Sequence, residues 1–253
     1  ISKGPAYWFL TFVAKRQYAV ADIIGVQSAS NVTFIKKESD DRPIEVLHNW
    51  NSRTKDEGCR IKIAQTRLRG RKICVYAGNM GIAQDIELLL KLAKNMQSNK
   101  LIGFLFVGRG SLITQYKEYA NEHSLNNVLI EDEIQSSEIH GLLKQCDIGL
   151  VSLNRAHKTH NIPGKFISYM QHEIPVIASV NPGNDLIQLV HDAVVGYATS
   201  DGNIRTLEKH INDIVSCAGG EDTYKKRCAA LYNKLYSSEA ASEQIISFFK
   251  NYR

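Results

Sequence analysis

The sequence lacks the features typical of membrane-spanning, disulfide-stabilised and zinc-binding proteins. No apolar run approaches the roughly 20 residues that a membrane helix needs, and the early stretch YWFLTFVA stops at Lys15 and Arg16. The chain of 253 residues has five cysteines, an odd number without a Cys-x-x-Cys pair, so neither a disulfide framework nor a zinc site is indicated. We therefore expect a soluble protein of a reducing cytoplasm.

Two kinds of nucleotide-binding motif are also missing. The sequence has no G-x-x-x-x-G-K-[ST] run, which disfavours an ATPase, and no complete G-x-G-x-x-G fingerprint, which disfavours a nicotinamide enzyme. His157 and His160 lie three residues apart, but no nearby carboxylate completes a metal site with them. We expect neither a cofactor nor a bound metal ion.

The positive charge is concentrated in one part of the chain. The net charge is +5, whereas residues 1–75 alone carry 14 Lys and Arg against 7 Asp and Glu. The densest part, residues 53–72, has no interleaved aromatic residues, so nucleic acid is not favoured as a partner. A solvated linker, or a face toward anionic lipid or a diphosphate, remains open as its role.

Apolar runs of strand length alternate with segments of helical period along the chain. Eight runs are predicted strands: ADIIGVQ, IEVLHNW, ICVYAG, LIGFLFVG, NVLIE, CDIGLVSL, PVIAS and VVGYAT. Because such alternation builds βα units, we predict an α/β fold with a doubly wound parallel sheet and helices on both of its faces.

The same pattern divides the chain into four expected parts. Residues 73–220 hold complete βα units and form one domain, whereas residues 1–52 are too few for an independent sheet and look like the remnant of a preceding domain. Residues 53–72 form a basic linker, and residues 221–253 are expected to be helices that pack back on the domains. We expect the sequence to be part of a longer protein.

Glycine turns follow two predicted strands, at the sheet edge where ligands bind in open α/β folds. Gly78 and Gly81 follow ICVYAG, and Gly108 and Gly110 flank Arg109 after LIGFLFVG. Glycine lets the backbone approach a ligand closely, and the first free amides of a helix suit a phosphate. The two turns predict contacts with an anion, with tight βα connections as the alternative.

Two further helix starts point to the same edge. Pro163, Gly164 and Lys165 begin one predicted helix, and Gly183 and Asn184 begin another. The helix dipole disfavours a cation in the first turn, so Lys165 is expected to contact a phosphate unless it is merely exposed. Four helix starts predict one anionic ligand among them.

An acidic run, IEDE, follows another predicted strand at this edge. Such a cluster is usually solvated, but one of its members, Glu133, is a candidate for reading a base or a ribose hydroxyl. Glu133 is therefore included among the candidate binding residues.

Four longer stretches carry a more specific pattern: YAGNMGIAQDIELLL, FLFVGRGSL, LLKQCDIGLVSL and NIPGKFISYMQHEIPVIASVNPGND. Together they resemble bacterial family-4 glycosyltransferases of the two-domain, Rossmann-like GT-B type. Within that family the chain looks most similar to the WbuB-like L-fucosamine transferases of O-antigen assembly. The resemblance covers nearly the whole chain and implies an acceptor-side remnant in residues 1–52 and a nucleotide-sugar donor domain in residues 73–220.

The chain departs from the family pattern at several positions. Asn79 and Gln84 stand where many relatives have an arginine and a lysine that grip the diphosphate. His160 and Ser168 stand where many relatives have two glutamates, so Ser168 is expected near the donor sugar. Residues 172–173 read His-Glu in place of Ala-Gly, which removes the glycine expected at a left-handed helix end.

The resemblance implies a retaining, metal-independent glycosyltransferase. The implied donor is a UDP-sugar, such as the 6-deoxy-2-acetamido hexose L-FucNAc, and the implied acceptor is a lipid-diphosphate-linked sugar of lipopolysaccharide, O-antigen or capsule synthesis. A peripheral contact with the cytoplasmic face of the inner membrane is left open. Because the acceptor-side groups would be largely missing, we expect the chain alone to bind a uridine nucleotide without transferring sugar. A nucleotide-sugar 2-epimerase and a non-catalytic nucleotide-binding module remain alternatives.

Overall fold

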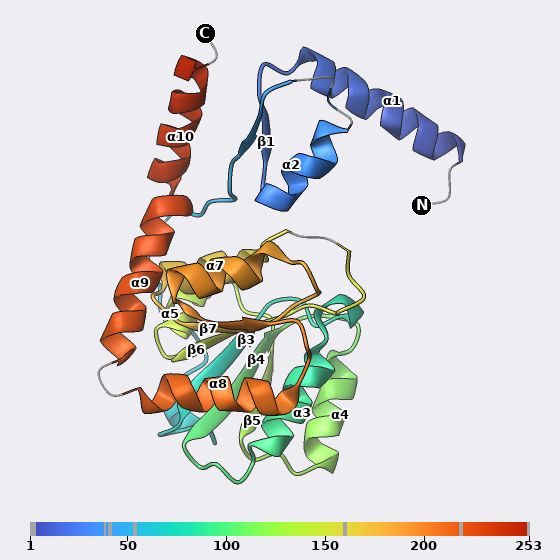
Figure 1. Cartoon of the computed structure of the whole chain (residues 1–253). Coiled ribbons are helices and arrows are strands. Elements are labelled where there is room, and N and C mark those ends of the chain that lie inside the picture. Colours follow the sequence, from blue (N-terminus) through green and yellow to red (C-terminus); the bar gives the residue numbers. More distant parts are fainter. Residues whose placement is uncertain are drawn as a thin grey trace.

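The computed structural model describes residues 4–37, 39, 42–52, 55–158, 161–217 and 220–251. His160 and the first two positions of the predicted linker lie outside the described residues. The described chain has a six-stranded sheet between helices, a small N-terminal unit, and two helices at its C-terminal end (Figure 1).

The main sheet is parallel throughout, with strand order β5-β4-β3-β6-β7-β8. Its strands are β3 (Lys72–Ala77), β4 (Ile102–Gly108), β5 (Val128–Asp132), β6 (Ile148–Ser152), β7 (Val176–Ser179) and β8 (Gly196–Thr199). The chain moves outward from β3 to β5 and then returns to the other side of β3 with β6. The strand order therefore reverses between β3 and β6, which is where open α/β sheets place their ligand crevice.

Helices cover both faces of this sheet, as the alternating pattern predicted. One face carries α5 (Ile139–Leu143), α6 (Gly164–Gln171) and α7 (Asp185–Ala193), and the other carries α3 (Ile86–Asn95), α4 (Ile113–Glu122) and α8 (Ile204–Ser216) (Figure 1). Successive side chains of a strand point to opposite faces, so β4 supplies Leu105 and Val107 to one core and Phe104 and Phe106 to the other. This burial on both sides explains why the strands read as continuous apolar runs.

Within the described ranges, three short 3-10 helices complete the connections: η1 (Ile63–Gln65), η2 (Ile82–Gln84) and η3 (Ser136–Glu138). The segment around η1 was predicted as part of a basic linker. It nevertheless buries Cys59, Ile61, Ile63 and Leu68 in the core beneath α5 and α6. Residues 59–68 are therefore packed against the sheet unit, although charged residues are interspersed among them.

The N-terminal unit consists of α1 (Pro5–Val20), β1 (Ile24–Val26), α2 (Ala29–Lys36) and β2 (Ile44–Val46), and its two strands pair in parallel. Both strands lie within predicted strand runs, so all eight predicted strands are present. None of the described helices is long and apolar enough to cross a bilayer.

The last two helices, α9 (Gly220–Leu235) and α10 (Ser238–Asn251), connect the two units (Figure 1). α9 packs on α6, and Tyr232 in it donates a hydrogen bond from its hydroxyl to the Asn51 carbonyl at 2.6 Å. α10 reaches the N-terminal unit, where Gln244 Nε2 donates to the Val46 carbonyl at 2.5 Å. The C-terminal helices thus contact both the main sheet unit and the end of β2.

Candidate functional site

The loops that follow β3 and β4 form one continuous backbone surface at the carboxyl edge of the sheet. The Gly78 amide donates to the Val107 carbonyl at 2.9 Å, and the Met80 amide donates to the Arg109 carbonyl at 2.7 Å. A Cβ atom on Gly108 would lie 1.8 Å from the Gly78 oxygen. The absence of a side chain there is therefore required by the neighbouring loop, a reason that the sequence did not reveal.

The same reasoning applies to the second glycine of the β4 loop. A Cβ atom on Gly110 would lie 2.3 Å from the Met80 carbonyl oxygen. Both glycines bring the two loops into backbone contact, and a ligand role for these turns stays a prediction.

Lys165 lies in the first turn of α6 and points along the end of β3. Its Cε would be 3.5 Å from a Cβ placed on Gly78, and its Nζ lies 4.8 Å from the centre of the Tyr76 ring. Among the described residues, no carboxylate pairs with this ammonium. Burial lowers the pKa of Lys165 to about 8, because the charged form loses water without gaining an anion. A cation at a helix N-terminus without a counter-charge fits an anionic ligand.

Lys165 and Ser168 line the same pocket, as their spacing predicted. Its volume is about 290 Å³, and its lining residues are Ala77, Gly78, Ile139, Leu143, Lys165, Ser168 and Tyr169. Beneath it, the buried Tyr169 hydroxyl donates toward the carbonyls of Val75 at 3.1 Å and Leu150 at 3.3 Å, with one proton for both. This tyrosine fixes α6 over the ends of β3 and β6.

Asn79 and Gln84 are brought together, but with each other rather than with an open phosphate site. Gln84 Oε1 accepts from Asn79 Nδ2 at 3.1 Å and from the Gly81 amide at 3.1 Å. The Tyr76 hydroxyl donates to the Asn79 carbonyl at 2.7 Å. Where relatives are expected to carry two cations, this loop therefore closes on itself through neutral amides.

Arg109 and Glu133 form an exposed ion pair at the same edge. Their closest atoms, Arg109 Nη1 and Glu133 Oε2, are 3.3 Å apart, and the side chains are 78% and 52% exposed. Such surface pairs contribute about 0–1 kcal/mol, so a phosphate can replace the glutamate at little cost. The structure thus joins two residues that the sequence suggested separately.

The starts of α6 and α7 differ in what they leave open. Pro163 precedes α6, and a Cβ on Gly164 would meet no atom of the described residues within 4 Å, so these residues leave the space at this helix start open. Asn184 is 3% exposed and caps α7, since its Oδ1 accepts from the Leu186 amide at 3.0 Å. Gly183 turns the chain before it with φ +77°. Asn184 therefore has a structural task at the edge where it was predicted to bind a ligand.

One contact at this edge was not foreseen. The Asp185 carboxylate accepts from the Ser30 amide at 3.0 Å and from the Ser30 hydroxyl at 2.5 Å, and Asn31 Nδ2 donates to Asn161 Oδ1 at 2.7 Å. These bonds join α2 to the carboxyl edge of the main sheet. These contacts were not predictable from the sequence, because the partners are 155 and 130 residues apart.

The position where the family pattern is broken has a clear conformation. Glu173 has φ +61°, so the left-handed residue expected at this helix end is present without its glycine, at a cost of roughly 1–2 kcal/mol. The neighbouring His172 ring contacts the Ser168 carbonyl and the ring of His140. His157, the described member of the histidine pair, belongs to no group of three metal-binding side chains within the part of the chain described.

Comparison with known proteins identifies the class of protein that this geometry belongs to. The chain belongs to the family described as glycosyl transferases group 1, which matches residues 60–234. A probable glycosyltransferase of Pseudomonas aeruginosa, WbjE, is 23% identical over 216 residues, which are 83% of this chain and 53% of WbjE.

Solved structures with the same fold are more distant in sequence. HepE of Anabaena, in complex with UDP and glucose, superposes with a TM-score of 0.74 at 16% identity over 98% of this chain and 69% of HepE. A TarM variant of S. aureus, in complex with UDP and other ligands, gives a TM-score of 0.70 at 16% identity over 97% of this chain and 46% of TarM. The fold is of the GT-B type, and the chain spans about half the length of WbjE and TarM.

Proposed function

We propose that the carboxyl edge of the main sheet binds the diphosphate of a UDP-sugar, and that the full-length protein transfers the sugar to an acceptor. The observation that carries this proposal is Lys165, a half-buried cation at a helix N-terminus with no carboxylate partner among the described residues. Membership of the glycosyltransferase family and the UDP complexes of HepE and TarM support it.

The chemistry assigned to these residues is electrostatic. In transfer, the bond from the sugar C1 to the diphosphate oxygen breaks, a bond to an acceptor hydroxyl forms, and the acceptor proton leaves toward the departing diphosphate. Lys165 and Arg109 would stabilise the charge that develops on the diphosphate, together with the amides at the start of α6. We propose that this occurs without a divalent cation and with retention at C1.

The finer assignments rest on the resemblance of the sequence to WbuB-like enzymes. We propose L-FucNAc as the donor sugar, and as acceptor a lipid-diphosphate-linked sugar of lipopolysaccharide, O-antigen or capsule synthesis, handled in the cytoplasm. A peripheral contact with the inner membrane is supported by the exposed Trp8, Phe9 and Phe12 of α1, which Lys15 and Arg16 follow.

A transfer assay with the full-length protein tests this proposal. A panel of nucleotide sugars is offered with a lipid-diphosphate acceptor, with and without a chelator, and products are identified by mass spectrometry and NMR. We expect transfer from a UDP-sugar, retention at C1 and no effect of the chelator. Epimerised sugar formed without acceptor would instead indicate an epimerase, and UDP binding without any transfer would indicate a binding module.

A further inference from the structure

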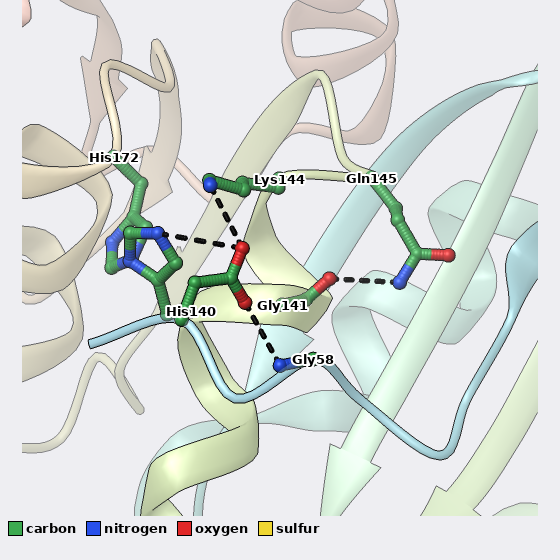
Figure 2. Close-up of polar contacts among 7 residues, drawn as sticks. Gly58, His140, Gly141, Lys144, Gln145 and His172 are labelled. Carbon is green, nitrogen blue, oxygen red and sulfur yellow. Dashed lines mark hydrogen bonds and ion pairs between the residues drawn. The ribbon is translucent and has the colours of Figure 1, made fainter. Parts of the chain in front are cut away.

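A chain of polar contacts lies at the opposite end of α6 from Lys165 (Figure 2). His172, the C-cap residue of α6, has its Nδ1 2.7 Å from the Ser168 carbonyl oxygen and its Nε2 2.9 Å from His140 Nδ1. His140 Nε2 in turn lies 4.0 Å from a carboxylate oxygen of Asp56. The three side chains come from the end of α6, from α5 and from the segment that leads into η1.

The hydrogen positions in this chain follow from what each atom can do. A carbonyl oxygen only accepts, so His172 Nδ1 must carry a hydrogen, which leaves Nε2 as an acceptor in the neutral ring. His140 Nδ1 must then donate to it. A neutral His140 would turn a lone pair at Nε2 toward the Asp56 carboxylate, whereas a protonated ring turns an N–H toward it. The arrangement therefore suits one extra proton, held on His140 between Asp56 and His172.

A second proton is opposed by the surroundings. It would have to enter His172 Nε2, which already faces the His140 N–H. Burial lowers the pKa of His172 and outweighs the hydrogen bond to the Ser168 carbonyl and the charge of Asp56, which raise it. The charges of His140 and Lys144 lower it further. Asp56 stays ionised, because the hydrogen bond from Lys144 at 2.8 Å and that from the Gly58 amide at 2.9 Å lower its pKa.

The cluster borders a pocket of about 450 Å³ at the amino edge of the sheet. The titratable groups that line it lie in or just after α5, just before β6, just after α6 and in α9: His140, Lys144, Cys146, Asp147, His172, Glu173 and Lys225. Asp147 pairs with Lys72 at 2.9 Å, and burial raises the pKa of Cys146. Within this set, His140 and His172 are the two imidazoles, and their rings contact each other.

The backbone holds this cluster in place. A Cβ on Gly141 of α5 would lie 2.3 Å from the Gly58 carbonyl carbon, so the two segments touch with no side chain between them. Gln145 ties them further, since its Nε2 donates to the Gly141 carbonyl at 2.8 Å (Figure 2). The same Nε2 donates to the Ile61 carbonyl at 3.0 Å. Asp56 is thus set against α5 close to His140.

We propose that His140 and His172 are positioning residues that share one proton, tie the end of α6 to Asp56, and so hold Lys165 and Ser168 in the donor pocket. The Ser168 carbonyl that His172 contacts belongs to the residue whose side chain lines that pocket. The proposal also accounts for His172, because alanine in its place offers no such bond. Its link to the donor rests on the proposed function.

Imidazole and amide NMR tests the shared proton without any ligand. We expect the Nδ1–H form at His172, a single titration common to both rings, and amide signals of Lys165 and Ser168 that follow its midpoint. His140→Asn keeps a donor in place of Nδ1–H but cannot take up a proton, so the amides should lose that midpoint. His191→Asn, on an exposed histidine of α7, is the matched control and should keep it. Two independent ring titrations, or α6 amides that ignore them, would overturn the proposal.

Calorimetric titration with UDP at neutral pH tests the link to the donor. His140→Phe removes the hydrogen bond to His172 and should weaken UDP binding by about three- to tenfold. His140→Asn keeps a donor at this position, so its UDP affinity should lie close to that of the parent. Equal losses in both variants would overturn the positioning role. If the parent chain does not bind UDP, the proposed function fails, while the NMR titrations still decide the shared proton.

Discussion

Replacing Lys165 tests the donor site most directly, and Lys165→Met keeps the length of the side chain while removing its charge. A charge-assisted hydrogen bond contributes about 1.5–3 kcal/mol, so UDP should bind about ten- to a hundredfold more weakly. Lys94→Met is the matched control, because Lys94 is an exposed lysine of α3 on the other face of the sheet. Calorimetry with UDP and with uridine separates the diphosphate from the nucleoside, and only UDP binding should change.

Because the pKa of Lys165 is lowered, UDP affinity should also depend on pH. With a pKa of about 8, Lys165 is charged in about nine in ten ligand-free molecules at pH 7 and in about one in ten at pH 9. An anion binds the charged form, so UDP affinity should fall as pH rises through 8 in the parent and remain flatter in Lys165→Met. UDP affinity that is equal in parent and variant at both pH values would refute the assignment of Lys165 to the phosphate.

The free energy of unfolding should rise with pH near the pKa of Lys165, whereas UDP affinity should fall. A folded-state pKa below the usual lysine value means that the folded chain holds its proton less tightly than the unfolded chain. The charged lysine therefore costs stability at pH 7, and this cost disappears as pH rises above 8. We expect Lys165→Met to raise the free energy of unfolding at pH 7 by about 1–2 kcal/mol, measured by urea denaturation. A variant that loses both binding and stability would indicate a damaged fold.

Three further predictions address other parts of the structure. Ser168→Ala should leave UDP affinity within about twofold but alter the preference among UDP-sugars, measured by competition binding, if this hydroxyl reads the donor sugar. Glu173→Gly should raise the free energy of unfolding by about 1 kcal/mol, because glycine adopts φ +61° without strain, and urea denaturation measures it. Burial lowers the pKa of His48, His172 and His210, so the free energy of unfolding should fall as pH decreases below about 6.5, where the unfolded chain takes up protons that the folded chain resists. Equal stability at pH 7.5 and pH 5.5 would contradict this.

The inner strands were the most predictable, because β4, β6 and β7 are buried on both faces and therefore read as apolar runs between turns. β4 shows this most clearly, since all of its residues from Ile102 to Gly108 are buried. The helix α8 was not predicted, although Leu207, Ile211 and Ile214 follow helical spacing on a polar background. Its sequence is mostly polar because only one stripe of it reaches the sheet.

The candidate site was predictable in its location but only partly in its contacts. The helix starts and glycine turns marked the carboxyl edge, and the spacing of Lys165 and Ser168 placed both in one pocket. The reason for Gly108, by contrast, is a backbone contact with the β3 loop that no local pattern encodes. The bond between Ser30 and Asp185 likewise joins residues far apart in the chain, so only the folded structure reveals it.

The C-terminal end of α6 combines a strained backbone at Glu173 with two hydrogen bonds of the neighbouring His172 ring. Losing glycine at position 173 strains the backbone by roughly 1–2 kcal/mol. A hydrogen bond contributes about 0.5–1.5 kcal/mol, so the bonds of the His172 ring to the Ser168 carbonyl and to His140 offset a strain of that size. Both substitutions lie at one end of a helix whose other end carries Lys165. Glu173→Gly should therefore raise the free energy of unfolding of the parent chain. His172→Ala should lower the free energy of unfolding both in the parent, with glutamate at position 173, and in the Glu173→Gly background.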